Sequence, residues 1–377
     1  MPRALGIRIG VPGAAEEAPS YTSGLAYDLE WTQNTAITSI NLATCFSGST
    51  ASYSVVEGAL PSGVTLSSGI ISGTPTGFRG RNWITIHAEN GAGEDDRRFL
   101  LSVKPDEVSG AFGTPYATIY DPTTLGVSTI SAQTVADLND VLIRDMTITG
   151  QLQLRGVNNA CITRCAISHS ADADGLRLSQ TGSGCDQIVA YGNSINSSGR
   201  DSIGISGDWP FHGPDLHILN NYIYNSGNNA SPKEHGMYIM TMCYIHGNIV
   251  YNSGYGNAIS TRSSADIRCN FVYTANDAGV SYYCDHPESD PNSWICRGNV
   301  VVNAGQDGIS YDFLLRDVPD ANNRVSTFEI VGNWGTADEG LYEAQTGYSG
   351  ASITASGNTT LASDAAGLAM FPATPWV

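Results

Sequence analysis

The sequence predicts an all-β protein in which an N-terminal β-sandwich is followed by a right-handed, single-stranded parallel β-helix of about nine or ten coils. Three observations support this prediction. A short pattern centred on asparagine recurs through residues 141–360. Residues 21–105 alternate between apolar and polar in short runs separated by glycine and proline turns. The sequence has 42 glycines and almost no helical periodicity, as expected for short strands joined by turns.

Residues 1–20 form an arm in which Leu5, Ile7 and Ile9 alternate with other residues. The arm could be an edge strand of the next domain or an attachment segment. In residues 21–105, runs such as Ile84, Ile86 and Ala88 keep one face of each expected strand apolar. These runs predict a β-sandwich with its core between two sheets.

The run LPSGVTLSSGIISGTPT at residues 60–76 closely resembles the signature of Ig-like domains, cadherin-like in shape, from bacterial surface proteins and phage structural proteins. Residues 88–93 are similar to the last hairpin of that family. The resemblance implies a spacer or a weak carbohydrate or protein binder, without catalysis.

Residues 106–130 are a linker rich in proline and glycine turns, which we expect to cap the first coil of the β-helix. A terminal coil needs a cap because its stacked apolar side chains are otherwise exposed. The β-helix is expected over residues 131–362, and a C-terminal cap over residues 363–377.

Each expected coil contains one asparagine between two apolar positions of a short strand. These asparagines are Asn193, Asn221, Asn248, Asn270, Asn299, Asn333 and Asn358, and Met146 and Cys165 take the same place in two earlier coils. A second strand follows a polar residue in the next coil, as at Asp174, Asp201 and His235. We expect the asparagines to form an internal ladder in which their amides bond to backbone groups of the turns.

These coils resemble the pectate lyase-like superfamily over roughly residues 128–360. The resemblance implies a parallel β-helix, a scaffold on which lyases, hydrolases, epimerases and adhesins all occur. Together with the Ig-like segment it is similar to phage tail spikes and polysaccharide depolymerases.

The net charge of −18 argues against a nucleic-acid partner, since binding a duplex requires a basic face. The eight cysteines contain no CxxC pair and fall mostly on or beside inward positions, which predicts buried free thiols and folding in a reducing cytoplasm. Arg8 interrupts the first apolar run, so we expect neither a secretory signal nor a membrane anchor. The expected location is a virion, or the extracellular space after release by lysis.

Lengthened segments at residues 206–215, 228–234, 284–292 and 313–324 are expected to form loops on both sides of two compact coils, and so to enclose a cleft. Its walls would offer Asp208, Trp209, Phe211 and His212 on one side and Asp285, His286, Glu288 and Asp290 on the other. Its floor would offer Tyr238, Arg262, Tyr283 and Asp312, with Lys233, Glu234 and His235 at a corner. Aromatic, carboxylate and cationic side chains together suit an acidic polysaccharide.

Three functions are open for this cleft. In β-elimination, Lys233 or His235 removes the proton beside a uronate carboxylate, which Arg262 or a metal neutralises, and Tyr238 or Arg262 protonates the leaving oxygen. In hydrolysis, Glu234 acts with Asp285 or Asp208. In the third, the cleft only binds a receptor polysaccharide, within a homotrimeric spike attached to a virion through its N-terminal region.

Lys233 and Arg262 are similar in type and order to the base and arginine of the alginate lyase and chondroitinase B type of β-helix lyase. In that type calcium clamps the uronate, and here Asp285, Glu288 and Asp290 could hold Ca²⁺, the one cofactor that the sequence suggests.

Structural roles compete with these assignments. His235 could cap a turn, since it stands where other coils have aspartate or asparagine. Trp209 and Phe211 could pack their own loop, and Arg262 could pair with Asp285 or Asp312.

Overall fold

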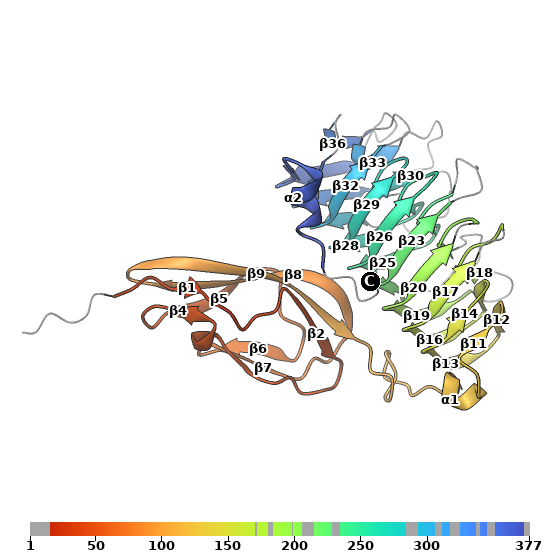
Figure 1. The fold of residues 1–377 in the computed structure, drawn as a ribbon, viewed down its shortest axis with the longest axis horizontal. Coiled ribbons are helices and arrows are strands. Elements are labelled where there is room, and N and C mark those ends of the chain that lie inside the picture. The colour runs from red at the N-terminus through yellow and green to blue at the C-terminus, as the bar shows by residue number, and fades with distance from the viewer. Residues whose placement is uncertain are drawn as a thin grey trace, which may run out of the picture.

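The computed structural model describes residues 16–169, 172–179, 184–197, 199–205, 215–227, 234–283, 293–305, 311–316, 325–336, 340–344 and 351–372. Within these ranges the chain is almost entirely strand and turn. Figure 1 shows a sandwich, in red and orange, beside a stack of parallel strands that runs from yellow to blue. Among the helices described, none is long and apolar enough to cross a membrane.

The sandwich consists of a four-stranded sheet, in the order β2-β9-β8-β5, and a three-stranded sheet, in the order β3-β7-β6, with a short β1-β4 pair. Its elements are β1 (Ser20–Tyr21), β2 (Asp28–Thr32), β3 (Ile40–Asn41), the 3-10 turn Leu42–Thr44, β4 (Phe46–Ser47), β5 (Ser52–Glu57), β6 (Val64–Ser67), β7 (Ile70–Gly73), β8 (Arg79–Asn90) and β9 (Gly93–Lys104). Ile84, Ile86 and Ala88 of β8 are fully buried and share one core with Leu42 and Ile71. The predicted sandwich is confirmed.

Three parallel sheets make up the rest of the fold, and the chain visits them in turn, so that each coil adds one strand to each sheet. Sheet 1 contains β10 (Thr118–Tyr120), β13 (Asn139–Arg144), β16 (Asn158–Thr163), β19 (Asp186–Tyr191), β22 (Leu216–Leu219), β25 (Cys243–His246), β28 (Ala265–Arg268), β31 (Ser293–Arg297), β34 (Thr327–Val331) and β37 (Ser352–Ser356). Sheet 2 contains β11 (Thr129–Ile130), β14 (Thr147–Ile148), β17 (Ala166–His169), β20 (Ser194–Ser197), β23 (Tyr222–Ser226), β26 (Ile249–Ser253), β29 (Phe271–Ala275), β32 (Val300–Ala304), β35 (Trp334–Gly335) and β38 (Thr359–Thr360). Sheet 3 contains β12 (Gln133–Ala136), β15 (Leu152–Arg155), β18 (Leu176–Ser179), β21 (Ile203–Ile205), β24 (Met237–Ile239), β27 (Ile259–Thr261), β30 (Val280–Tyr283), β33 (Tyr311–Arg316) and β36 (Gly340–Ala344).

Alternate side chains of all three sheets fill the inside of this stack, as strand geometry requires. In one coil Ile162, Ile167 and Leu176 point inward from the three sheets and are buried in a single continuous core. The apolar positions predicted on both sides of the asparagines lie in this core. The predicted parallel β-helix is confirmed.

The asparagine ladder forms as expected along the turn between sheets 1 and 2. The Asn221 side chain donates from Nδ2 to the Ala190 carbonyl oxygen at 2.9 Å and to Oδ1 of Asn248 at 3.0 Å. The same Asn248 oxygen accepts the Asn221 backbone N–H at 2.9 Å. This arrangement repeats from Asn193 to Asn358, so each amide satisfies backbone groups that would otherwise be buried without partners.

The sandwich packs directly against the outer surface of sheets 1 and 2. Trp83 of β8 contacts Phe271 and Trp334, with ring centroids 6.0 Å apart in each pair, and donates from Nε1 to the Gly298 carbonyl oxygen at 2.9 Å. Two turns away, Arg81 donates to the Gly247 carbonyl oxygen at 3.0 Å. The two domains therefore share an apolar interface.

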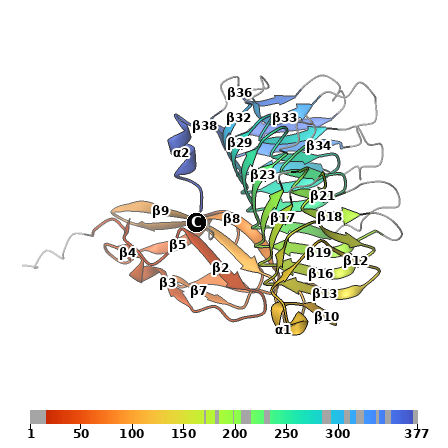
Figure 2. The ribbon, with the colours of Figure 1, turned by 45° about the vertical axis from the view of Figure 1, so that its right-hand side comes forward.

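Two further features close this interface. Gly80 allows the close approach of β8, because a Cβ there would lie 2.4 Å from the His246 carbonyl oxygen. The helix α2 (Asp364–Leu368) stands beside β32 and β38, as Figure 2 shows. Tyr27 of the sandwich donates to the Met370 carbonyl oxygen just beyond α2, at 2.8 Å.

The cysteines within the described residues are free and buried, as predicted, but not all of them point into the coils. Cys161 and Cys269 lie on the outside of the stack. Cys161 packs against Ala111, Tyr116 and Tyr191, and Cys269 packs against Trp83. Burial raises the pKa of the Cys269 thiol to about 12, so it stays protonated.

One register prediction is wrong. The sequence suggested that Ile309 aligns with Val280 and that a loop begins at Phe313. In the structure Phe313 pairs with Val280 and Arg316 with Tyr283, so residues 311–316 are strand β33. In this register Phe313 and Leu315 are both buried in the core. Ile309 lies outside the described residues.

A set of ion pairs fixes the linker to the first coils. Arg144 pairs with Asp121 at 2.9 Å and with Glu107 at 3.1 Å, and Arg164 also pairs with Glu107. Asp121 caps the short helix α1 (Pro122–Leu125), since its Oδ1 accepts the Thr124 N–H at 2.7 Å. The Thr124 backbone bond and Arg144 lower the pKa of the Asp121 carboxyl to about 2.

Asp121→Asn is therefore expected to lower stability near neutral pH and to have no effect in strong acid. The folded pKa of about 2 lies below the value of about 3.9 for a free aspartate, so the charge stabilises the fold above pH about 4 and this contribution is lost as the pH falls toward 2. Asparagine keeps the helix cap and removes only the charge. Thermal unfolding of both proteins at several pH values measures the difference, and a difference that persists at pH about 2 would contradict this account.

Candidate functional site

The outer face of sheet 3 carries the residues that the sequence placed on a cleft floor. Tyr238 of β24 lies outside the coil between Met237 and Ile239, which point inward. Ser281 and Tyr283 of β30 likewise alternate with Val280 and Tyr282, which point inward. The predicted inward and outward positions of these two strands are confirmed.

Tyr238, Arg262, Tyr283 and Arg316 follow one another along this face on successive coils, and we call them the aromatic–arginine stripe. The Arg262 guanidinium carbon lies 4.8 Å from the ring centroid of Tyr238 and 4.8 Å from that of Tyr283. The Arg316 guanidinium carbon lies 5.7 Å from the Tyr283 centroid. Each such cation–π contact contributes about 0.5 to 2 kcal/mol, depending on exposure.

Small residues beneath the stripe hold Arg262 in place. Arg262 donates from Nη1 to Ser260 Oγ at 2.7 Å, and Ser281 Oγ lies 3.3 Å from the same hydroxyl. Arg262 is only 7% exposed, because the two tyrosine rings cover it. Arg262 thereby fixes the two rings, while the Arg316 side chain is 44% exposed and pairs with Asp277 at 3.4 Å.

His235 occupies a turn position inside a second side-chain ladder. Asp201 Oδ1 accepts the His235 N–H at 2.5 Å, His235 Nδ1 accepts the Asn257 N–H at 3.0 Å, and Asn257 Oδ1 accepts the Ala278 N–H at 3.0 Å. Burial, assisted by the charges of Arg262 and Arg316, lowers the pKa of His235 to about 3. Its ring stacks on Tyr238 at 5.4 Å. These contacts favour the turn-capping role over a catalytic base.

Glu234 and Asp312 do not lie on the open face. Glu234 is 5% exposed and packs against the turn at Gly227. Asp312 is fully buried, and its Oδ2 would lie 1.9 Å from a Cβ at Gly335 of sheet 2. The changed register places Asp312 beside Gly279, directly before the inward residue Phe313 of β33. The expected role of Asp312 on the cleft floor is wrong.

The loops expected to form the cleft walls lie outside the described residues. They contain Asp208, Trp209, Phe211, His212, Lys233, Asp285, His286, Glu288 and Asp290. The described strands β21, β30 and β33 of sheet 3 end at Ile205, Tyr283 and Arg316. Among the residues described, no group of three or more histidine, cysteine or acidic side chains could hold a metal.

A hollow of about 220 Å³ at one end of the stripe was not foreseen from the sequence. Its lining residues are Asp174, Arg177, Arg200, Asp201, Gly204, Ile205, Tyr238 and Met240, and we call it the Gly204 hollow. Gly204 pairs with Arg177 on one side and with Tyr238 on the other, at a position whose side chain would point outward. The sequence signal that could have indicated this hollow is Gly204 itself, since the outward positions on the coils before and after it are Arg177 and Tyr238.

The carboxyl groups of the Gly204 hollow are perturbed by burial. Burial raises the pKa of Asp201 well above its usual range, and the neighbouring Asp174 raises it further. Burial also raises the pKa of Asp174, against the opposing charges of Arg177 and Arg200. Perturbed carboxyl groups in a hollow are a common property of functional sites.

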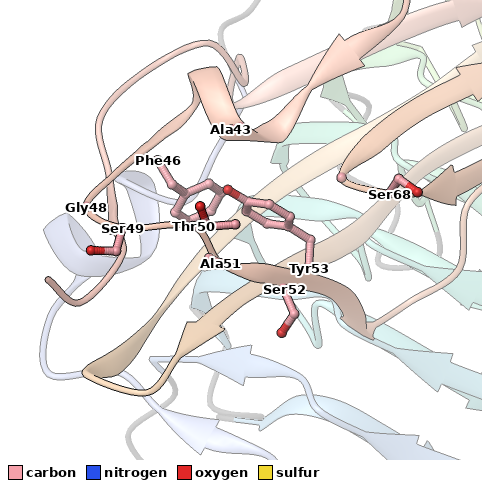
Figure 3. A pocket seen from close by; sticks show the side chains of 10 residues that line it. Ala43, Phe46, Gly48, Ser49, Thr50, Ala51, Ser52, Tyr53 and Ser68 are labelled. Atoms are coloured by element: carbon pink, nitrogen blue, oxygen red, sulfur yellow. The ribbon is translucent and has the colours of Figure 1, made fainter. Parts of the chain in front are cut away.

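A second hollow, of about 510 Å³, lies on the sandwich and is shown in Figure 3. Its lining residues are Ala43, Phe46, Gly48, Ser49, Thr50, Ala51, Ser52, Tyr53, Ser68 and Gly69. The Phe46 and Tyr53 rings lie 5.7 Å apart, and no lining residue is charged. This composition distinguishes it from the charged face of sheet 3.

Residues 18–104 match the family described as "Putative Ig domain", in agreement with the sandwich. The chain is thus an Ig-like domain followed by a parallel β-helix. None of the curated proteins matches the sequence.

Solved structures show only partial likeness, with a TM-score of 0.20 in each case. The endo-fucoidan hydrolase MfFcnA9 from glycoside hydrolase family 107 is 18% identical over 32% of this chain and 21% of that chain. Two proteins from Bacteroides fragilis, a putative alpha-galactosidase and a putative alpha-galactosidase/melibiase, are 21% and 17% identical over 36% and 34% of this chain and 30% and 29% of theirs. The chain therefore spans less than a third of each relative, and the likeness indicates no shared overall fold.

Proposed function

We propose that the protein binds an acidic polysaccharide along the outer face of sheet 3. The observation that carries this proposal is the aromatic–arginine stripe, in which tyrosine rings and guanidinium groups alternate on successive coils. Neighbouring coils are about 4.8 Å apart, so an extended sugar chain could meet a ring or a cation at each step. In a chain of net charge −18, a row of cations on one face favours an anionic ligand there.

The proposed reaction on the bound chain is β-elimination, as in lyases of the pectate lyase-like superfamily. Lys233 takes the proton from the carbon beside the uronate carboxylate, a carbon–carbon double bond forms, and the glycosidic carbon–oxygen bond breaks. Tyr238 supplies a proton to the leaving oxygen, and Arg262 stabilises the carboxylate charge. Tyr238 lies on the outer face, and the Arg262 charge, 4.8 Å from the centroid of its ring, supports these two roles. His235 has no part in this scheme, because its Nδ1 is already bonded.

The proposed setting is a tail spike or depolymerase of a phage-like particle, folded in a reducing cytoplasm before release. In this setting the N-terminal region attaches to the particle, and the active form is a homotrimer. Calcium at Asp285, Glu288 and Asp290 would assist carboxylate binding. The free, buried cysteines support folding under reducing conditions.

Arg262→Gln is expected to weaken polysaccharide binding by about tenfold, since both tyrosine rings lose the cation that fixes them. Binding to alginate, pectate and host capsule is measured by calorimetry. Arg155→Gln is the control, because Arg155 lies on the outer face of sheet 3, three coils before Tyr238 and outside the stripe. Equal affinity of Arg262→Gln and the parent protein would contradict the proposal.

The reaction is tested on the same polymers by following ultraviolet absorbance of unsaturated uronates together with reducing ends. Elimination raises both signals, and Lys233→Ala or Arg262→Gln should abolish both. Reducing ends without absorbance would indicate hydrolysis instead. Binding without either signal would identify a receptor-binding spike.

A further inference from the structure

The Gly204 hollow lies where the outer face of sheet 3 lacks one side chain. In the same outward row, Arg177 precedes Gly204 and Tyr238 follows it, one coil apart. A Cβ at Gly204 would lie 2.4 Å from Asp174 Oδ2, so glycine leaves this carboxyl group room to line the hollow. The volume of 220 Å³ holds about seven waters at about 30 Å³ each, which is room for one sugar ring and not for a longer segment.

The Asp174 carboxyl group has bonding capacity that the fold does not use. Asp174 is 4% exposed and accepts a hydrogen bond from Arg177 Nη1 at Oδ2, at 3.2 Å. Its Oδ1 is buried without a hydrogen-bond partner among the described residues. Leaving a buried acceptor unsatisfied costs about 1 to 3 kcal/mol, so a donor that enters the hollow would recover part of this.

The cations of the hollow also have donors available. The Arg177 side chain is 35% exposed, and that of Arg200 is 46% exposed, with its nearest acidic partner, Asp172, at 3.7 Å. Tyr238 and Met240 supply apolar surface on the side of the stripe. The hollow therefore offers acceptors, cationic donors and an apolar side within the size of one sugar ring.

We propose that the Gly204 hollow is a subsite that selects a uronic acid unit, with Arg177 and Arg200 pairing with its carboxylate and Asp174 accepting hydrogen bonds from its hydroxyl groups. A uronate has all three matching parts: a carboxylate, neighbouring hydroxyl donors and the C–H face of its ring. This inference rests on the proposed function, in which the bound polymer is acidic. It adds a separate place, next to the stripe, where a uronate unit of that polymer is recognised.

The test uses the whole chain and simple methyl glycosides of glucuronate, galacturonate, glucose and galactose, titrated by ligand-observed NMR. The uronates are expected to bind at least about tenfold more tightly than the neutral sugars. Gly204→Ala should lower uronate affinity at least about tenfold by filling the hollow, and Arg177→Gln should remove the preference for uronates. Gln153→Ala is the matched control, because Gln153 precedes Arg177 in the same outward row, and it should bind uronates like the parent protein.

Equal affinity for uronates and neutral sugars would overturn the inference, as would the lack of any uronate binding at affinities on the order of 10 mM. Unchanged uronate binding by Gly204→Ala, with folding verified by circular dichroism, would do the same. If Gly204→Ala does not fold, Arg177→Gln decides, since its side chain is partly exposed and its loss leaves no cavity. Polymer binding measured in parallel separates the two proposals. A protein that binds acidic polymer without preferring uronate units overturns only this inference, whereas failure to bind any acidic polymer overturns the proposed function.

Discussion

Asn248→Ala is expected to lower the free energy of unfolding by about 3 to 6 kcal/mol, because several buried groups lose partners at about 1 to 3 kcal/mol each. Asn248 is fully buried and donates to the Ile218 carbonyl oxygen at 2.8 Å and to Asn270 Oδ1 at 2.9 Å. Its own Oδ1 accepts both the backbone and the side-chain N–H of Asn221. Alanine can replace none of these bonds, and water cannot reach the site. Urea unfolding followed by circular dichroism measures the loss.

Asn358→Ala is the matched control at the end of the same ladder. Asn358 donates to the Ile330 carbonyl oxygen at 2.7 Å and accepts from Asn333, but it is only partly buried. Solvent can take over part of its bonding, so we expect a loss of about 1 kcal/mol. Equal losses at Asn248 and Asn358 would show that burial does not set the strength of the ladder.

Trp83→Ala is expected to cost about 3 to 5 kcal/mol, which is typical for truncating a large buried aromatic side chain. Trp83 is 5% exposed, contacts rings of both domains, and donates to the Gly298 carbonyl oxygen. Arg98 also lies over its ring, with the guanidinium carbon 4.2 Å from the centroid. Because the lost contacts join the two domains, the parent protein should unfold in one transition and the variant in two. Differential scanning calorimetry distinguishes these outcomes.

Val56→Ala is the control for this second prediction, since Val56 lies on the sandwich with 58% of its surface exposed. It should keep a single transition and change stability by less than about 0.5 kcal/mol. A Trp83→Ala protein that still unfolds in one transition with the midpoint of the parent protein would show that the interface does not couple the domains.

Local periodicity made most of the fold predictable. The recurring asparagines identified the coils and their ladder, because a side chain that must satisfy the same turn in every coil repeats at the same place. The alternation of Ile84, Ile86 and Ala88 similarly identified a strand with one buried face. Both signals depend on neighbours in sequence or on the next coil, which a pattern can reveal.

The misplaced strand had a similarly clear cause. Ile309 and Phe313 fall on the same alternation, four residues apart, so the alternation does not decide which of them aligns with Val280. The error placed Asp312 on the expected open face, whereas it is buried at the start of β33. The part of the site that depended on alternation within well-defined strands, Tyr238 and Tyr283, was placed correctly on the outer face.

The Gly204 hollow and the interface at Trp83 could not be predicted from sequence. Both depend on side chains that come together across coils or between domains, at distances along the chain that no short pattern covers. Asp174 and Asp201 were expected at turns. The structure shows that both also line the hollow beside Gly204. A pair of Arg262 with Asp285 or Asp312 was one alternative to its role at a uronate, and the structure adds contacts of Arg262 with two tyrosine rings.

Strand β8 contacts the turn at Gly247 through Arg81 and the turn at Gly298 through Trp83, and these turns belong to coils that are not neighbours. A bare stack of coils transmits force only from each coil to the next, so it can peel open from either end. The Ig-like domain instead joins coils that are not neighbours, so these coils cannot separate from one another without also leaving β8. Pulled along its axis, the β-helix should therefore retain longest the coils between the turns at Gly247 and Gly298, which include the coil that carries Arg262.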